Sequence, residues 1–214
     1  MSSLAELAQA VFQGDFRGSS VITQQLIDSG VTPMEIINQG LLAGMDIVAP
    51  KFKAGEMFVP EVMMSARALS EGMKLVKPLI SDEDASKAAT IVIGTVQGDL
   101  HDIGKNLVVM LLESGGFNVI DLGVDVAPDK FVVAIKEHNP KFVGLSALLT
   151  TTMMAMQETI EAITEAGLRD QVTIMVGGAP LSQEFADQIG ADVYCLDAVA
   201  AKEAATRIVA NAAK

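Results

Sequence analysis

The spacing of hydrophobic and polar positions changes near residue 80. Before that point, apolar residues recur at intervals of three and four, which is the spacing of one face of an α-helix. Glycine, proline and polar residues separate these stretches. The pattern predicts about four helices packed as a bundle, with apolar faces at Leu4–Val11, Val21–Ile27, Ile36–Leu42 and Met63–Leu75.

The rest of the chain alternates short apolar runs with helical stretches. The runs have the length of buried parallel strands and lie at Thr90–Thr95, Asn118–Asp121, Phe142–Ser146, Val172–Val176 and Asp192–Leu196. Helical segments are expected at 103–114, 128–138, 152–166 and 181–189, and after residue 197. Repeated strand–helix units of this length predict an α/β fold with a five-stranded parallel sheet of the flavodoxin-like, or Rossmann-like, kind.

The change of period also predicts two domains. We expect a helical bundle domain over residues 1–86 and an α/β domain over residues 87–214. The stretch Ser81–Asp84 is acidic and polar and follows Pro78. It is therefore the predicted linker and a candidate hinge.

Composition narrows the range of functions. Half of the 214 residues are hydrophobic, enough for ordinary globular cores. The net charge is −12, and there is one tyrosine and no tryptophan, so we expect no nucleic-acid partner. No apolar run reaches the roughly 20 residues that cross a bilayer, and the N-terminus lacks the pattern of a signal peptide. The single cysteine, Cys195, cannot form an internal disulfide. We expect it to be a small buried residue in a cytoplasmic protein.

Three polar or glycine-rich features follow predicted strands. They are the loop Gly98–Gly104, the stretch Ser146–Thr150 and the pair Gly177–Gly178. In a flavodoxin-like sheet of order 2-1-3-4-5, ligands bind where the strand order reverses, between strands 1 and 3. We therefore expect His101 and Ser146 at the same rim of the sheet, with Gly177 one strand further along.

The residue types at this rim predict a metal ligand with a supporting carboxylate. A metal-bound imidazole commonly donates its other N–H group to a carboxylate, and Asp99 precedes His101 by two positions. Ser146 is a candidate to extend the pair by a hydrogen bond to Asp99. Glycines at 177 and 178 allow a ligand to approach the backbone. The alternative is structural, with Asp102 capping the next helix and the glycines forming an ordinary turn.

Taken together, the three features resemble the signature of the base-off/His-on cobalamin-binding fold. The resemblance implies that His101 replaces the corrinoid's own benzimidazole as the lower cobalt ligand, supported by Asp99. It also implies that the displaced nucleotide tail enters a slot in the sheet domain. Ser146 and Thr150 are expected near the tail, and Gly177 and Gly178 along the slot. The other expected cofactor-binding residues are Asp102, Ile103, Gly104 and Leu148.

The helical part carries a second resemblance. Gly55–Met64 is similar to a stretch in the helical cap of methyl-carrying corrinoid proteins, including the cobalamin module of methionine synthase and the corrinoid proteins of methylamine, methanol and methoxy metabolism. This implies that Met57, Phe58 and Met63 face the corrinoid from above. Methionines at helical spacing are also ordinary core residues, and that alternative stays open.

These resemblances imply a methyl carrier with cobalamin or a related corrinoid as cofactor. Such a protein accepts a methyl group on Co(I) from a substrate:corrinoid methyltransferase. It delivers the group to a second methyltransferase acting on tetrahydrofolate or a thiol, and a reductive activase is a further expected partner. Two histidines and one cysteine argue against a separate zinc site for thiol activation, so we expect no catalysis by this chain alone. The alternatives are a corrinoid-sensing regulator and the cobalamin-binding subunit of an adenosylcobalamin isomerase.

Overall fold

A computed structural model describes residues 3–80 and 88–212, which belong to two compact units. The helical unit comprises residues 1–88 with 114–116, and the sheet unit comprises residues 89–113 with 117–214. Both the predicted linker at Ser81–Asp84 and the predicted boundary at residue 86 fall outside the described residues.

The helical unit consists of four helical stretches, as the hydrophobic spacing predicts. The third stretch runs without a break from Pro33 to Lys53 and contains one π-helical segment, Ile36–Leu42. In this segment Gly40 packs against Leu7 of the first helix. A Cβ atom on Gly40 would lie 2.6 Å from the Leu7 side chain, so glycine allows close approach there. The elements are α1 (Leu4–Phe12), α2 (Phe16–Asp28), α3 (Pro33–Glu35), η1 (Ile36–Leu42), α4 (Ala43–Lys53), α5 (Val59–Val76) and η2 (Lys77–Leu79).

The sheet unit is built on five parallel strands in the order β2-β1-β3-β4-β5, which confirms the flavodoxin-like prediction. The register places Thr95, Ser146 and Gly177 side by side at the carboxyl ends of three adjacent strands. The strands are β1 (Thr90–Thr95), β2 (Asn118–Asp121), β3 (Phe142–Ser146), β4 (Thr173–Gly177) and β5 (Val193–Cys195).

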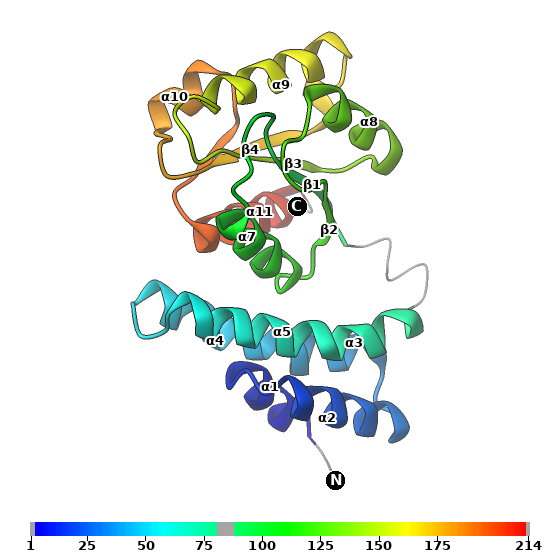
Figure 1. Ribbon diagram of the computed structural model, residues 1–214. Coiled ribbons are helices and arrows are strands. Elements are labelled where there is room, and N and C mark those ends of the chain that lie inside the picture. Colours follow the sequence, from blue (N-terminus) through cyan, green and yellow to red (C-terminus); the bar gives the residue numbers. More distant parts are fainter. Residues whose placement is uncertain (1–2, 81–87, 213–214) are drawn as a thin grey trace. The chain divides into compact units, whose positions relative to one another are not determined.

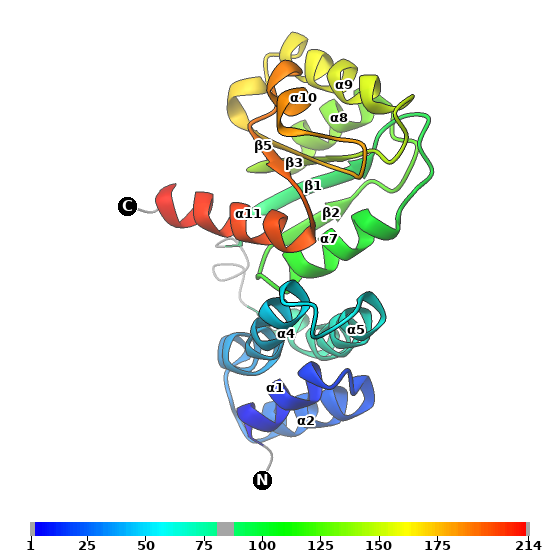
Figure 2. The same cartoon turned by 90° about the vertical axis from the view of Figure 1, so that its left-hand side faces the viewer.

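Helices cover both faces of the sheet (Figures 1 and 2). On one face lie α8 (Pro128–His138), α9 (Met153–Glu165) and α10 (Gln183–Gln188), and on the other lie α7 (Ile103–Glu113) and α11 (Ala198–Ala212). Alternate strand residues point to the two faces, so Val92 joins one apolar core and Ile91 joins the other. With both faces covered, the carboxyl-end rim is where a ligand can enter.

Candidate functional site

The centre of the site is a histidine held by an aspartate in the loop between β1 and α7. Gly98 has a φ of +82°, which turns the chain sharply after β1. Asp99 Oδ1 lies 2.7 Å from Nδ1 of His101 and accepts the His101 backbone N–H at 3.0 Å. The imidazole therefore donates its Nδ1–H to the carboxylate, and the ring's free lone pair is on Nε2. Half of the His101 side chain is exposed, and Nε2 has no hydrogen-bond partner among the described residues.

Asp99 is itself fully buried and multiply hydrogen-bonded. Its Oδ2 accepts the N–H groups of Leu148 at 2.7 Å and Leu149 at 3.2 Å, and the Thr152 hydroxyl at 2.7 Å. Burial alone would raise the pKa of this carboxyl, but the hydrogen bonds from Leu148, His101 and Thr152 outweigh it and hold the pKa well below its usual range. Asp99 is thus a fixed negative charge behind the imidazole.

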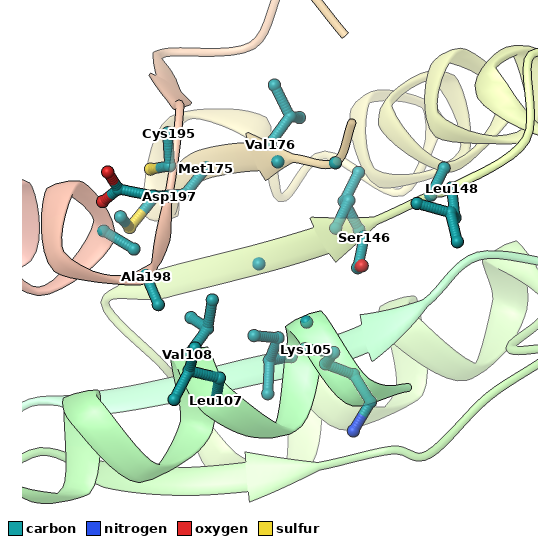
Figure 3. A pocket seen from close by; sticks show the side chains of 18 of the residues that line it. Lys105, Leu107, Val108, Ser146, Leu148, Met175, Val176, Cys195, Asp197 and Ala198 are labelled. Atoms are coloured by element: carbon teal, nitrogen blue, oxygen red, sulfur yellow. The ribbon is translucent and has the colours of Figure 1, made fainter. Parts of the chain in front are cut away.

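The third member of this hydrogen-bonded group is Thr152, and the prediction that Ser146 bonds Asp99 is wrong. Ser146 ends β3, and its side chain points into a neighbouring hollow (Figure 3). The turn that follows β3 instead brings Thr152, six residues later, over the Asp99 carboxylate. The Thr152 backbone N–H donates to the Leu149 carbonyl at 3.1 Å, which keeps the turn closed.

A second loop holds the histidine loop from the opposite side. Asp125, between β2 and α8, accepts the Gly98 N–H at 2.7 Å and donates its own N–H to the Asp99 carbonyl at 3.0 Å. Asp125 has a φ of +52°, an uncommon conformation for a residue with a side chain. Thr95 adds a hydrogen bond from its hydroxyl to the His101 carbonyl at 2.9 Å. The backbone of the histidine loop is therefore held by β1 itself and by the loop that follows β2.

Beside the histidine loop, a slot of about 540 Å³ runs over the sheet between α7 and α11. Its side walls come from these two helices and its floor from β1, β3, β4 and β5. Residues from all of these elements line the slot, among them Ile91, Ile93, Val108, Ser146, Met175 and Ala198.

Small residues keep this slot open. Gly144 lies in the middle of β3, and a Cβ atom there would come within 2.9 Å of Ile93. Ala198 and Ala201 present only methyl groups from α11. Gly178 has a φ of +146°, and a Cβ atom on it would lie 1.8 Å from the Ala147 carbonyl oxygen. Glycine is required at 178 because the ends of β3 and β4 pack backbone against backbone there.

Most of the predicted rim residues line the slot, but Thr150 does not. Asp102, Ile103, Gly104, Ser146, Leu148, Gly177 and Gly178 all contribute to it. Thr150 is exposed in the turn after β3 and is not among the lining residues. Its predicted place near the tail stays a prediction, and the lining of the slot does not add to it. The Asp102 carboxylate accepts a hydrogen bond from the side-chain amide of Asn106 at 3.1 Å. Among the described residues it accepts none from a backbone N–H of α7, so it is not the helix cap that the structural alternative predicts.

Apolar side chains surround the exposed imidazole. Leu100 and Ile103 are 71% and 75% exposed, and Leu148 and Leu149 are about two-fifths exposed. Such a group of exposed large aliphatic residues is typical of a binding surface. Only Ile103 and Leu148 are expected from the sequence, and the run of leucines after β3 is the signal that could identify Leu149.

A buried lysine on α7 is a further residue that sequence reasoning does not identify. Lys105 is 3% exposed, and its ammonium group bonds the Asp121 carboxylate and the Asn106 amide. The chain of contacts continues from Asn106 to Asp102. Figure 3 shows the Lys105 nitrogen turned away from the slot, so only the aliphatic part of this side chain contributes to the wall.

The predicted cap residues lie in the helical unit. Met57 is buried and lines a separate hollow with Phe12, Lys51 and Met64, whereas Phe58 is 68% exposed and Met63 43% exposed. The two exposed side chains are available to a ligand and the buried one fits an ordinary core position. Their contact with a corrinoid stays a prediction.

His101 is not part of a larger group of metal-binding side chains in the described residues. Within residues 3–80 and 88–212, no three His, Cys, Asp or Glu side chains gather as a metal site. A metal held by His101 must then take its other ligands from elsewhere, as a metal in a macrocycle does. The free Nε2, the apolar surroundings and the adjacent slot fit the corrinoid that the sequence resemblance implies.

No helix in the described part of the chain is long and apolar enough to cross a membrane.

Replacing Asp99 with asparagine is expected to lower the free energy of unfolding of the sheet unit by about 3 kcal/mol at pH 7. The change removes the charge that the surrounding N–H and O–H donors require. Because the folded pKa lies below the unfolded value of about 4, this contribution is present above that value and lost as the pH falls. The difference in the free energy of unfolding between wild type and variant should therefore shrink as the pH falls from about 5 to about 2. Fluorescence of Tyr194, the single tyrosine, reports unfolding of the sheet unit, and a pH-independent gap would contradict the assignment.

Comparison with known proteins gives matches over nearly the whole chain. Two B12 binding domain models match, at residues 89–206 and 3–77. A corrinoid protein of Desulfitobacterium hafniense (strain Y51) is 41% identical over 98% of both chains. The trimethylamine corrinoid protein of Methanosarcina barkeri is 40% identical over 96% of this chain and 97% of its own. The methanol:cobalamin methyltransferase complex MtaBC of the same organism contains a chain with a TM-score of 0.88 and 34% identity, matching 97% of this chain and 79% of that one.

Proposed function

The chain belongs to the corrinoid proteins built from B12-binding domains, and we propose that it carries methyl groups within a methyltransferase system, with His101 as the lower ligand of the cobalt. The observation that carries this proposal is the free Nε2 of an imidazole whose Nδ1 is held by a buried, charged carboxylate. A bound corrinoid supplies a cobalt atom that can accept and release a methyl group.

The residues around His101 have separable tasks in this proposal. Asp99 keeps the proton on Nδ1 and directs the Nε2 lone pair to the metal. The negative charge of Asp99 strengthens the donation of the Nε2 lone pair to a bound metal. Thr152 keeps Asp99 in place through the 2.7 Å hydrogen bond. The His101–Asp99 pair can thereby couple lower-ligand binding to the charge at the cobalt.

The slot is the proposed site of the nucleotide tail. With His101 in the lower position, the corrinoid's own base is displaced and needs a place away from the cobalt. The slot begins beside the histidine loop and extends between α7 and α11. Leu100, Ile103 and Leu148, exposed around the imidazole, supply an apolar surface for the lower side of the macrocycle.

Methylamine use is the donor chemistry that the relatives support best. Proteins named for trimethylamine and dimethylamine are 40–47% identical to this chain, and the methanol complex is 34% identical. We therefore propose an amine:corrinoid methyltransferase as the donor partner and a second methyltransferase as the acceptor partner. A reductive activase is the third proposed partner, because Co(I) is readily oxidised. Tetrahydrofolate and thiols remain the two acceptor candidates.

The direct test is to isolate the protein with its native corrinoid and to identify the upper ligand by mass spectrometry. We then supply trimethylamine or dimethylamine with an isotopically labelled methyl group, together with the matching methyltransferase. The expected result is one labelled methyl group per chain, released when an acceptor methyltransferase is added. The His101→Ala protein should take up less than about a tenth of the label under the same conditions.

Two outcomes would reject the methyl carrier. A light-labile adenosyl group as the native upper ligand would indicate the isomerase subunit. Tight binding to operator DNA that depends on the corrinoid would indicate the regulator. The charge of −12 and relatives named as corrinoid proteins favour the methyl carrier over both.

A further inference from the structure

The inner part of the slot is lined almost entirely by hydrocarbon and sulfur. Ile91 forms part of the floor, Val108 and Leu112 come from α7, and Ala201 comes from α11. Met175 on β4 and Cys195 on β5 complete the wall, and both are at least nine-tenths buried. Burial raises the pKa of the Cys195 thiol to about 11, so this group is a neutral and weak hydrogen-bonding partner.

The charged residues beside the slot already have partners. The Lys105 ammonium bonds Asp121 and Asn106 and points away from the slot. Asp197 is exposed at the start of α11, where its carboxylate accepts the Ala200 N–H at 2.7 Å. Ser146 stands near the mouth, beside the histidine loop. Among the described residues, Asp197 lines the slot close to Cys195 and is its one carboxylate acceptor on that side, so a group buried against Met175 and Cys195 would meet no strong donor from these two side chains.

We propose that this slot selects corrinoids by their lower base, accepting benzimidazole and phenol bases and discriminating against purines. The inference rests on the proposed function, in which the tail enters the slot. The carbon ring of benzimidazole and the ring of p-cresol match the apolar walls, and flat rings pack well against Met and Cys sulfur. The displaced benzimidazole has one free ring-nitrogen acceptor, which is fewer than adenine has, and p-cresol has none. Adenine would bury several ring-nitrogen acceptors against the same apolar walls, and acceptors left without a donor are costly.

The choice of lower base is independent of cobalt coordination here. Because His101 supplies the lower ligand, the base contributes through burial in the slot alone. A phenol base has no ring nitrogen and cannot bind cobalt, yet it should be retained as well as benzimidazole. This separates selection by the slot from selection by ligation.

The test compares four corrinoids that share one macrocycle on the full corrinoid-free chain. They are cobalamin, p-cresolylcobamide, adeninylcobamide and cobinamide, which lacks the tail. Dissociation constants come from absorbance titration, and histidine ligation is read from the spectrum. We expect cobalamin and p-cresolylcobamide to bind within about threefold of each other, and adeninylcobamide at least about tenfold more weakly. Cobinamide should bind more weakly than cobalamin because it leaves the slot unfilled.

Two results would overturn the selection, and each has a different meaning for the function. Equal affinity for adeninylcobamide and cobalamin, with histidine ligation in both, removes the selection and leaves the methyl carrier intact. Failure of all four corrinoids to show histidine ligation removes the proposed function together with the selection.

Variants of Cys195 test the physical cause. Cys195→Ser places a stronger hydrogen-bonding group in the wall, and Cys195→Ala is the matched control without it. The ratio of adeninylcobamide to cobalamin dissociation constants should fall in the serine variant and stay near the wild-type ratio in the alanine variant. Met175→Gln and Met175→Leu form a second pair with the same expectation, should the first pair fold poorly by Tyr194 fluorescence. Unchanged ratios in both polar variants would overturn the apolar wall as the cause.

Discussion

Replacing His101 with alanine is expected to remove protein ligation of the bound cobalt completely. The imidazole is the one group in the described residues that is free, half exposed and backed by a buried carboxylate. Loss of a partner that only supports a metal ligand typically costs about 10–100-fold in affinity, and loss of the ligand itself should cost at least as much. The visible spectrum of the variant should lose its histidine-bound form, because His138, the other histidine, lies at the carboxyl end of α8.

His138 offers a matched control for this change. It is the second of two histidines and lies at the end of α8 with its side chain 40% exposed. His138→Ala should leave both the spectrum and the affinity at wild-type values. The assignment of His101 fails if its alanine variant keeps the wild-type spectrum.

Gly178→Ala is expected to have the second large effect, on both stability and cofactor binding. The new Cβ atom would lie 1.8 Å from the Ala147 carbonyl oxygen, at a φ of +146° that side chains rarely adopt. The turn after β3 must then move, and this is the turn that holds Asp99 through Leu148 and Thr152. We expect about 3 kcal/mol or more of lost stability and at least about tenfold weaker corrinoid binding.

Gly167→Ala separates the strained backbone from the collision. Gly167 also has a positive φ, +71°, but a Cβ atom added there would meet no atom within 4 Å. Its substitution should cost about 1 kcal/mol and leave corrinoid affinity unchanged. Urea unfolding followed by Tyr194 fluorescence measures the first effect, and corrinoid titration measures the second. Equal behaviour of the two variants would contradict a special role for Gly178.

The sheet can be predicted from the sequence because buried parallel strands leave a strong signal. The runs at Thr90–Thr95 and Phe142–Ser146 are apolar apart from hydroxyl residues at their ends, and their predicted bounds are those of the structure. The order of the strands follows from a general rule for flavodoxin-like sheets. That rule brings His101 and Ser146 to one rim without knowledge of any contact.

The individual contacts at the rim could not be predicted in the same way. Ser146 and Thr152 are both hydroxyl residues near the end of β3, and strand periodicity does not say which of them reaches Asp99. The answer depends on the path of the turn, which is set by the backbone hydrogen bond from Thr152 to Leu149 and by the packing of Gly178 on Ala147. The contact of Gly178 with Ala147 joins distant parts of the chain, so a local sequence pattern cannot predict it.

The slot shows the same limit. Gly144, Ala198 and Ala201 are ordinary small residues in the sequence, and only the sheet register and the helix positions bring them around one cavity. Lys105 is also misleading in sequence, because a lysine on an amphipathic helix is normally exposed. Its burial depends on Asp121 at the end of β2, sixteen positions away.

The most direct test of the central claim is electron paramagnetic resonance of the cobalt(II) form. Protein made with nitrogen-15 histidine in the His138→Ala background is loaded with unlabelled cobalamin, so that His101 is the labelled residue. An axial nitrogen-15 nucleus splits each cobalt line into a doublet, and an axial nitrogen-14 nucleus splits it into a triplet. Binding of cobalt by His101 predicts doublets. Triplets from the corrinoid's own base, or lines without nitrogen splitting, would contradict it.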